Sequence, residues 1–188
     1  MKSKQKKIMP ILFRMSVLVM LFFILGFSLG DSSKENTLLK TILISDAALN
    51  KVSVDGLMAE QYYAESGFAY EVGDYNSVES NCRIAREYYF KESQGYKRIK
   101  AELKATGIED KLIILYIEML EDLIELTDNM FEACEHFESA ARYYDIGNYD
   151  MGAGEIDMMN EKIRNHDKAV ERYNNLLAEY KVELELRK

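Results

Sequence analysis

Apolar or small residues recur every three or four positions through almost the whole chain after residue 31, which is the period of one face of an α-helix. The pattern occupies four stretches, at residues 38–70, 78–103, 112–144 and 156–184. Between them lie Gly73, Gly107 and Gly147, and glycine at a helix end readily takes the left-handed conformation that lets the chain reverse. Runs of strict apolar–polar alternation are lacking. The pattern therefore predicts an all-α fold of four long helices.

The apolar period stays near 3.5 residues over each stretch, which indicates helices that pack antiparallel at an angle of about 20°. The first helix should begin at Ser32 or Ser33, because Ser32 and Glu35 have the spacing of a capping box. The pattern does not fix where the fourth helix begins, because Gly152 and Gly154 each cost a helix about 1 kcal/mol relative to alanine. The predicted architecture is an antiparallel up-down four-helix bundle made of two long helical hairpins.

The hexapeptides at the two hairpin turns are related in sequence. They read Tyr70-Glu-Val-Gly-Asp-Tyr75 and Tyr144-Asp-Ile-Gly-Asn-Tyr149. When the chain is shifted by the offset that superimposes these hexapeptides, the apolar face of the first helix falls on that of the third, with Leu38 on Leu112, Ile42 on Tyr116, Leu49 on Leu123, Val52 on Leu126 and Tyr63 on Phe137. This correspondence indicates either a duplicated hairpin or two hairpins under similar packing demands.

Each glycine–tyrosine turn also resembles the inner turn of tetratricopeptide hairpins, where glycine allows close helix approach and a tyrosine packs back. The resemblance covers only residues 70–75 and 144–149. The offset between the two turns is more than twice the period of about 34 residues in that family. The resemblance therefore implies similar turn chemistry only.

The first 30 residues indicate a membrane. A basic head, residues 2–7, precedes an apolar run without acidic residues. Residues 8–29 are long enough to cross a hydrocarbon core of about 30 Å, with Arg14 near the inner interface. Because basic flanks stay inside, we expect a single-pass cell-membrane protein with a cytoplasmic amino terminus and residues 31–188 outside. The alternative is a signal peptide cleaved after Gly30, which would release a secreted protein.

We expect residues 31–188 to form one domain. The net charge of this domain limits the classes of partner that it could bind. Five of the 24 basic residues and none of the 32 acidic ones lie in the first 30 positions, so the remainder carries 19 basic against 32 acidic groups, a net charge of −13. Such a domain repels phosphate backbones, and nucleic acid is not an expected partner. Apolar positions on a second face of the third helix (Ile113, Ile114, Leu120 and Ile124) indicate either a fuller core or a homo-oligomer contact.

Cys82 and Cys134, the two cysteines of the chain, are candidates for a disulfide. The midpoint between them, residue 108, adjoins the turn at Gly107, so an antiparallel hairpin would place them at the same height. Two cysteines in a translocated domain suit one disulfide. The alternative is a pair of buried free thiols that pack as small apolar residues.

Catalytic and metal-binding patterns are weak. The one Gly-x-Ser-x-Gly match, Gly26 to Gly30, lies in the apolar amino-terminal run and not between a strand and a helix, and no Gly-rich phosphate loop occurs. We expect neither an enzyme nor a resident cofactor. Di-metal carboxylate bundles use Glu-x-x-His, which this sequence lacks. The nearest groupings are Glu132, Glu135 and His136 on the third helix, with Glu161 and His166 on the fourth. A solvated acidic face and a core histidine account for them more simply.

Tyrosine supplies the binding candidates. Tyrosine is enriched at binding hot spots, and Tyr70, Tyr75, Tyr144 and Tyr149 flank the two related turns. We therefore expect a membrane-tethered, extracytoplasmic scaffold or accessory subunit that binds an unknown protein through these residues. The alternatives are a small-molecule sensor bundle that needs a partner chain for output and, with less support, a metal or redox bundle.

Overall fold

The computed structural model describes residues 33–187, and their side chains from residue 37 onward. This part is all-α. It consists of α2 (Ser33–Glu71), α3 (Tyr75–Ala105), α4 (Lys111–Asp145) and α5 (Tyr149–Glu185). The chain divides into residues 1–30 and 31–188, and the four helices all belong to the second unit. The predicted membrane segment at residues 8–29 and the capping residue Ser32 lie outside the described residues. Within the described range, no helix is both long enough and apolar enough to cross a bilayer.

The three predicted glycine turns are confirmed. Gly73, Gly107 and Gly147 have φ angles of +75°, +64° and +76°, which L-residues with a side chain rarely adopt. A capping side chain follows each turn: Asp74 and Asn148 accept from the backbone three residues on, and the Asp110 carboxylate accepts from Leu112 N at 2.9 Å. Cap and glycine together fix where each helix ends and the next begins.

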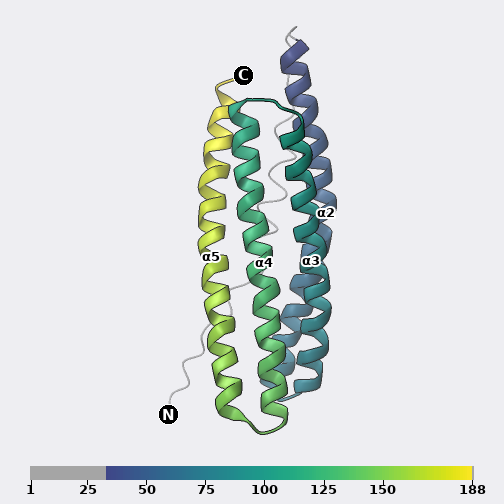
Figure 1. Cartoon of the computed structure of the whole chain (residues 1–188), viewed down its shortest axis with the longest axis vertical. Helices are drawn as coiled ribbons and strands as arrows, with labels where there is room; N and C mark the ends of the chain where they lie inside the picture. The colour runs from purple at the N-terminus through teal and green to yellow at the C-terminus, as the bar shows by residue number, and fades with distance from the viewer. Residues whose placement is uncertain (1–32, 188) are drawn as a thin grey trace. The chain divides into compact units, whose positions relative to one another are not determined.

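The helices run alternately up and down, so the Gly73 and Gly147 turns lie at one end of the bundle (Figure 1). The Gly107 turn and the start of α2 lie at the other end. Each helix packs along the next one in the chain, and α2 also touches α4 across the bundle. The backbones of α2 and α5 approach each other at few points. The predicted hairpins are present, but the side of the bundle between α2 and α5 is the least tightly packed.

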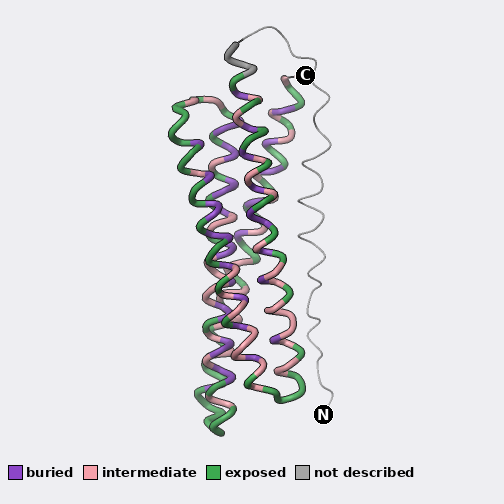
Figure 2. The backbone as a smooth tube through the Cα atoms, turned by 90° about the vertical axis from the view of Figure 1, so that its right-hand side faces the viewer, coloured by how far each residue is buried: buried purple, intermediate pink, exposed green. Residues whose placement is uncertain are grey.

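Burial follows the predicted apolar faces, and buried and exposed residues alternate along the helices (Figure 2). Burial is greatest on α4. Every position assigned to the face of the second helix is buried in α3. Ile113 and Leu120 on α4 are each 1% exposed, so they belong to a fuller core, whereas Ile114 is half exposed. On α5 the buried positions lie mainly in the second half, from Ala169 to Leu184. The core is therefore asymmetric, with α4 at its centre.

The structure defines the start of α5, which the sequence pattern left open. The helix begins at Tyr149 and runs through Gly152 and Gly154, ahead of the first expected apolar position, Ile156. Asn148 caps this early start. Gly152 has a packing reason to be glycine, since a Cβ there would lie 2.8 Å from the ring of Tyr144. The penalty for glycine in a helix is thus offset by a close contact that the pattern alone could not reveal.

Candidate functional site

The Gly73 and Gly147 turns, which share one end of the bundle, are structurally equivalent. Gly73 N and Gly147 N donate to the carbonyls of Tyr70 and Tyr144, at 3.1 and 3.0 Å. The next backbone amides donate five residues back, over 2.9 Å at the first turn and 2.8 Å at the second. Both turns are therefore Schellman motifs with the same hydrogen bonds. The sequence correspondence between the two hexapeptides extends to backbone geometry.

The four candidate tyrosines form one connected group of rings, which we call the turn-end cluster (Tyr70, Tyr75, Tyr144 and Tyr149). Ring centroids lie 6.1 Å apart for Tyr70 and Tyr75, and 6.0 Å apart for Tyr144 and Tyr149. Across the two turns, Tyr70 and Tyr144 are 5.8 Å apart and Tyr75 and Tyr144 are 5.7 Å apart. These distances are typical of favourable aromatic pairs. Tyr144 is central, because it contacts the other three rings.

Exposed apolar residues lie in the two turns that carry the turn-end cluster. Val72 is 81% exposed, Ile146 73% and Tyr149 65%, and all three belong to the two turns or their flanks. Exposed acidic residues lie among them, namely Glu71, Asp74, Asp145 and Asp150. Large contiguous apolar patches on a protein surface mark interaction sites. The end of the bundle thus presents aromatic and aliphatic groups within an acidic setting.

Two phenols of this region, Tyr70 and Tyr63, have raised pKa values. Partial burial, with added effects from Tyr144 and Tyr75, raises the pKa of Tyr70 to about 12. Burial beside two cysteines raises the pKa of Tyr63, one layer further in, above its usual range. Tyr63 and Tyr70 both pack on Phe137, with centroids 6.1 and 5.4 Å away. Tyr70 therefore offers a ligand a hydroxyl group and a ring face, not a charge.

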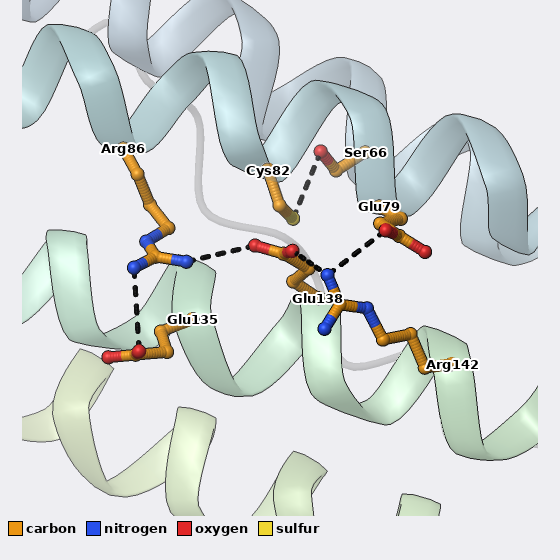
Figure 3. Close-up of polar contacts among 7 residues, drawn as sticks. All are labelled: Ser66, Glu79, Cys82, Arg86, Glu135, Glu138 and Arg142. Carbon is orange, nitrogen blue, oxygen red and sulfur yellow. Dashed lines mark hydrogen bonds and ion pairs between the residues drawn. The ribbon is translucent and has the colours of Figure 1, made fainter.

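Cys82 and Cys134 lie together in the core cluster between α3 and α4, as their symmetric spacing about Gly107 predicts. Both are fully buried and both thiols are free in the structure. The Cys82 thiol donates to Ser66 Oγ on α2 at 3.3 Å (Figure 3). Burial raises the pKa of the Cys134 thiol well above its ordinary value, and the neighbouring Cys82 raises it further. The disulfide between them stays a prediction, and the two cysteines belong to the same core cluster.

A chain of ion pairs crosses from α3 to α4 beside the thiols (Figure 3). Arg86 binds Glu138 at 3.0 Å and Glu135 at 3.4 Å. The Glu138 carboxylate, whose residue is 6% exposed, also binds Arg142, which reaches Glu79 at 3.0 Å. Two arginines therefore compensate the one buried carboxylate, and removal of a single partner would leave it half-paired. These groups align α3 with α4 and do not involve the turn-end cluster.

The weaker metal candidates do not come together. Glu132 pairs with Lys162, and His136 Nδ1 lies 2.7 Å from Glu155 on α5. His166 lies next to Asp167. Among the described side chains, no three His, Cys, Asp or Glu residues are grouped so that they could hold a metal ion. Glu132, His136 and their partners on α5 instead connect α4 to α5.

A polar site near the other end of the bundle was not predicted from the sequence. Tyr116 on α4 donates to Asp46 Oδ1 on α2 at 2.7 Å, and the rings of Tyr116 and Tyr180 lie 6.1 Å apart. Burial raises the pKa of Asp46, and the hydrogen bond from Tyr116 partly opposes this rise. Three helices meet here around one carboxylate. In the sequence, the one sign that Asp46 could contact other helices is that it adjoins Ser45, which lies on the apolar face of the same helix.

Another buried carboxylate lies between α2, α3 and α4. Glu92 is 3% exposed, and Tyr96 donates to its Oε1 at 2.6 Å. Gly56 on α2 makes room for it, since a Cβ at Gly56 would lie 2.6 Å from Glu92 Cδ. In the sequence pattern Glu92 falls on the apolar face of its helix, and the missing side chain at Gly56 explains how that face accepts it.

Comparison with known proteins gives no relative: no family model, no curated protein and no solved structure matches the chain.

Proposed function

We propose that this protein is a membrane-tethered, extracytoplasmic scaffold or accessory subunit that binds another protein through the turn-end cluster. The observation that carries the proposal is the meeting of four tyrosines from two distant turns in one ring group with exposed aliphatic neighbours. Tyrosine supplies large contact area with few rotatable bonds, and it is over-represented among residues that dominate binding energy.

The position of the cluster supports this use. Helix α2 begins three residues after residue 30, and its 39 residues lead to the Gly73 turn. At about 1.5 Å per residue, α2 is about 58 Å long. With residues 8–29 in a membrane, the bundle would be attached at one end and would carry the cluster at the far end. A rigid spacer with a binding tip suits a subunit that reaches a partner away from the lipid surface.

Charge indicates what kind of partner fits. The acidic residues around the cluster and the net charge of −13 beyond residue 30 repel anionic lipids and nucleic acids. A protein surface with an apolar centre and basic edges would meet both the exposed side chains and the carboxylates. The same charges keep two copies from joining tip to tip.

Site-specific photo-crosslinking in the native host tests the binding proposal. A photoreactive phenylalanine analogue would replace Tyr149 or Ile146 in the full-length chain, with exposed Leu186, near the opposite end of the bundle, as the matched control. We expect both tip positions to capture one and the same protein and Leu186 not to capture it. The purified partner should lose affinity for the Tyr149→Ala variant. Capture at Leu186 alone, or none at the tip, would overturn the proposal.

The proposed membrane location is tested separately, by measuring the intact mass of the protein from its host and by adding protease outside intact cells. A full-length mass together with external digestion of residues 31–188 is the expected result. A mass that begins at Asp31 would favour the secreted alternative, and complete protection from external protease would contradict both.

A further inference from the structure

The outer face of α2 carries a second apolar feature, distinct from its core face. We call it the α2 stripe; it consists of Leu43, Ala47, Asn50, Val54, Leu57, Gln61, Ala64 and Phe68. Its steps alternate between four and three residues, and none of its members is charged. Val54 is 57% exposed, Leu57 42% and Phe68 71%. Alternation of three and four is the a/d spacing of a coiled-coil seam.

The equivalent face of α4 packs against another helix of the same chain. At the offset that superimposes the two hexapeptides, Ala47, Val54, Gln61 and Phe68 correspond to Glu121, Asp128, Glu135 and Arg142. All four residues on α4 are charged and form ion pairs with α3. The other four stripe positions correspond to Ile117, Ile124, Phe131 and Glu138, none of which is exposed, and Phe131 and Glu138 both contact Arg86 of α3. On α4 this face is therefore packed against α3, whereas the matching face of α2 carries exposed apolar residues.

We infer that the α2 stripe is the contact surface for α2 of a second copy of this chain, in parallel orientation. The inference rests on the proposed membrane tether. Because residue 30 lies only three residues before α2, two anchored copies would present the starts of their α2 helices at the same membrane surface. Tethering raises the local concentration of one stripe for the other and excludes the antiparallel arrangement, in which one anchor would be carried away from the membrane.

Side-chain chemistry along the stripe suits a parallel pair. Like residues meet across a twofold interface, so Leu43, Leu57 and Phe68 would each pack on their own counterparts. Asn50 and Gln61 would face their counterparts as amides that both donate and accept hydrogen bonds. A polar amide in the seam sets register and favours a defined oligomer. The Gln61 amide already donates to Glu65 Oε1 at 3.0 Å within its own helix, which leaves its oxygen as an acceptor.

The size of the stripe explains why the tether matters. From Leu43 to Phe68 the stripe is about 38 Å long, and a helix with side chains is about 10 Å wide. Each copy would bury about 400 Å², so the pair falls below the roughly 1,200 Å² or more that stable interfaces of soluble proteins bury. Two strongly acidic domains also repel each other. The contact would therefore form between anchored copies and be weak between released ones.

Cysteine crosslinking of the full-length chain in its own membrane tests this inference. Leu43→Cys and Phe68→Cys would be oxidised separately and as a mixture. The wild-type chain, whose Cys82 and Cys134 are fully buried, serves as background. Ile114→Cys, on the outer face of α4 and half exposed, is the matched control. We expect each stripe variant to form a disulfide-linked dimer by itself, while Ile114→Cys stays monomeric.

Three results would overturn the inference. Crosslinks that form only when Leu43→Cys and Phe68→Cys are mixed would show an antiparallel pair. No crosslink at either position, or equal crosslinking at Ile114→Cys, would remove the interface. Adding Leu57→Glu should abolish the crosslinks while the helical circular dichroism stays unchanged, because Leu57 is partly exposed in the single chain.

The crosslinking test of the α2 stripe can fail or succeed independently of the photo-crosslinking test of the turn-end cluster. Tyr149→Ala should leave the stripe crosslinks intact, and Leu57→Glu should leave photo-crosslinking at Tyr149 intact. Loss of stripe crosslinks with retained partner capture at Tyr149 would refute only the pairing of copies. Retained stripe crosslinks without capture would refute only the binding tip.

Discussion

Tyr70 and Tyr144 occupy the same position in the two related hairpins, and their rings touch with centroids 5.8 Å apart. Tyr63 and Phe137, which correspond at the same offset, make a similar contact at 6.1 Å. Residues that correspond in the two hairpins therefore meet across the α2–α4 diagonal, as they would across a local twofold axis. The half of the bundle next to the Gly73 and Gly147 turns is built around this relationship, and the turn-end cluster is its exposed end.

Replacing Tyr144 should cost far more stability than replacing Tyr149. Tyr144 contacts three rings and covers Gly152, so Tyr144→Ala should lower the free energy of unfolding by about 2 kcal/mol. Tyr149 is 65% exposed, and Tyr149→Ala should cost less than about 0.5 kcal/mol. Urea denaturation followed by circular dichroism measures both. Equal losses would contradict the central place of Tyr144.

Much of this fold could be predicted from the sequence because its elements are long and locally encoded. The apolar period located all four helices, and Gly73, Gly107 and Gly147 marked all three turns. The related hexapeptides placed Tyr70 and Tyr144 at one end of the bundle from the sequence alone. Signals of this kind depend only on residues within one or two helical turns of each other. They can therefore be recognised in the sequence without knowing the tertiary packing.

Features that depend on side-chain packing between distant helices could not be predicted. The looser α2–α5 side follows from how α5 packs on α4, and nothing within either helix indicates it. Asp46 is bound by Tyr116, which follows it by 70 residues in the sequence. The early start of α5 depends on the fit of Gly152 against Tyr144, which reverses the reading of that glycine as a helix breaker.

The two glycines near the start of α5 should respond oppositely to alanine. A Cβ at Gly154 meets nothing within 4 Å, so Gly154→Ala should raise the free energy of unfolding by about 0.5–1 kcal/mol through helix propensity. A Cβ at Gly152 would clash with the Tyr144 ring, and Gly152→Ala should be destabilising by about 1–3 kcal/mol. Thermal and urea unfolding of the two variants check the signs. Stabilisation by both would show that the Tyr144 ring moves aside freely.

The partly buried Asp46 should make the protein less stable as pH rises above about 4. Burial raises the pKa of Asp46 in the folded state, so the native protein holds this proton over a pH range in which the unfolded chain has lost it. Stability from this group is full below the unfolded pKa and is lost as pH rises through the folded pKa. The Asp46→Asn variant has no such proton to lose. Its free energy of unfolding should therefore rise relative to that of the wild type as pH increases from 3.5 to 7.

Tyr116→Phe provides the matched control for Asp46. The hydrogen bond from Tyr116 lowers the pKa of Asp46, so its removal should move the loss of stability to higher pH. Urea midpoints of the three proteins across pH 3.5–7 give the comparison. A constant difference between wild type and Asp46→Asn over this range would show that Asp46 titrates as an ordinary surface carboxylate.

The thiols should be paired when the protein is made outside the cytoplasm. Formation of a Cys82–Cys134 bond removes one proton and one electron from each thiol, which an exchanging disulfide accepts as it becomes two thiols. Because burial raises the pKa of Cys134 and both residues are fully buried, exchange has to precede final packing of α3 on α4. The bond would close a loop of about 50 residues and add about 4 kcal/mol on the entropic view.

Intact mass after unfolding in an alkylating agent without reductant measures the pairing. We expect no alkyl adducts on protein from its native host, and a reductant should lower the urea midpoint of the wild type while leaving Cys134→Ala unchanged. Two adducts would show free thiols, which would remove the disulfide and weaken the case for an extracytoplasmic domain. Since the same bond would fix α3 against α4 beside Arg86 and Glu138, its presence should also make that half of the bundle the last to exchange its amide hydrogens.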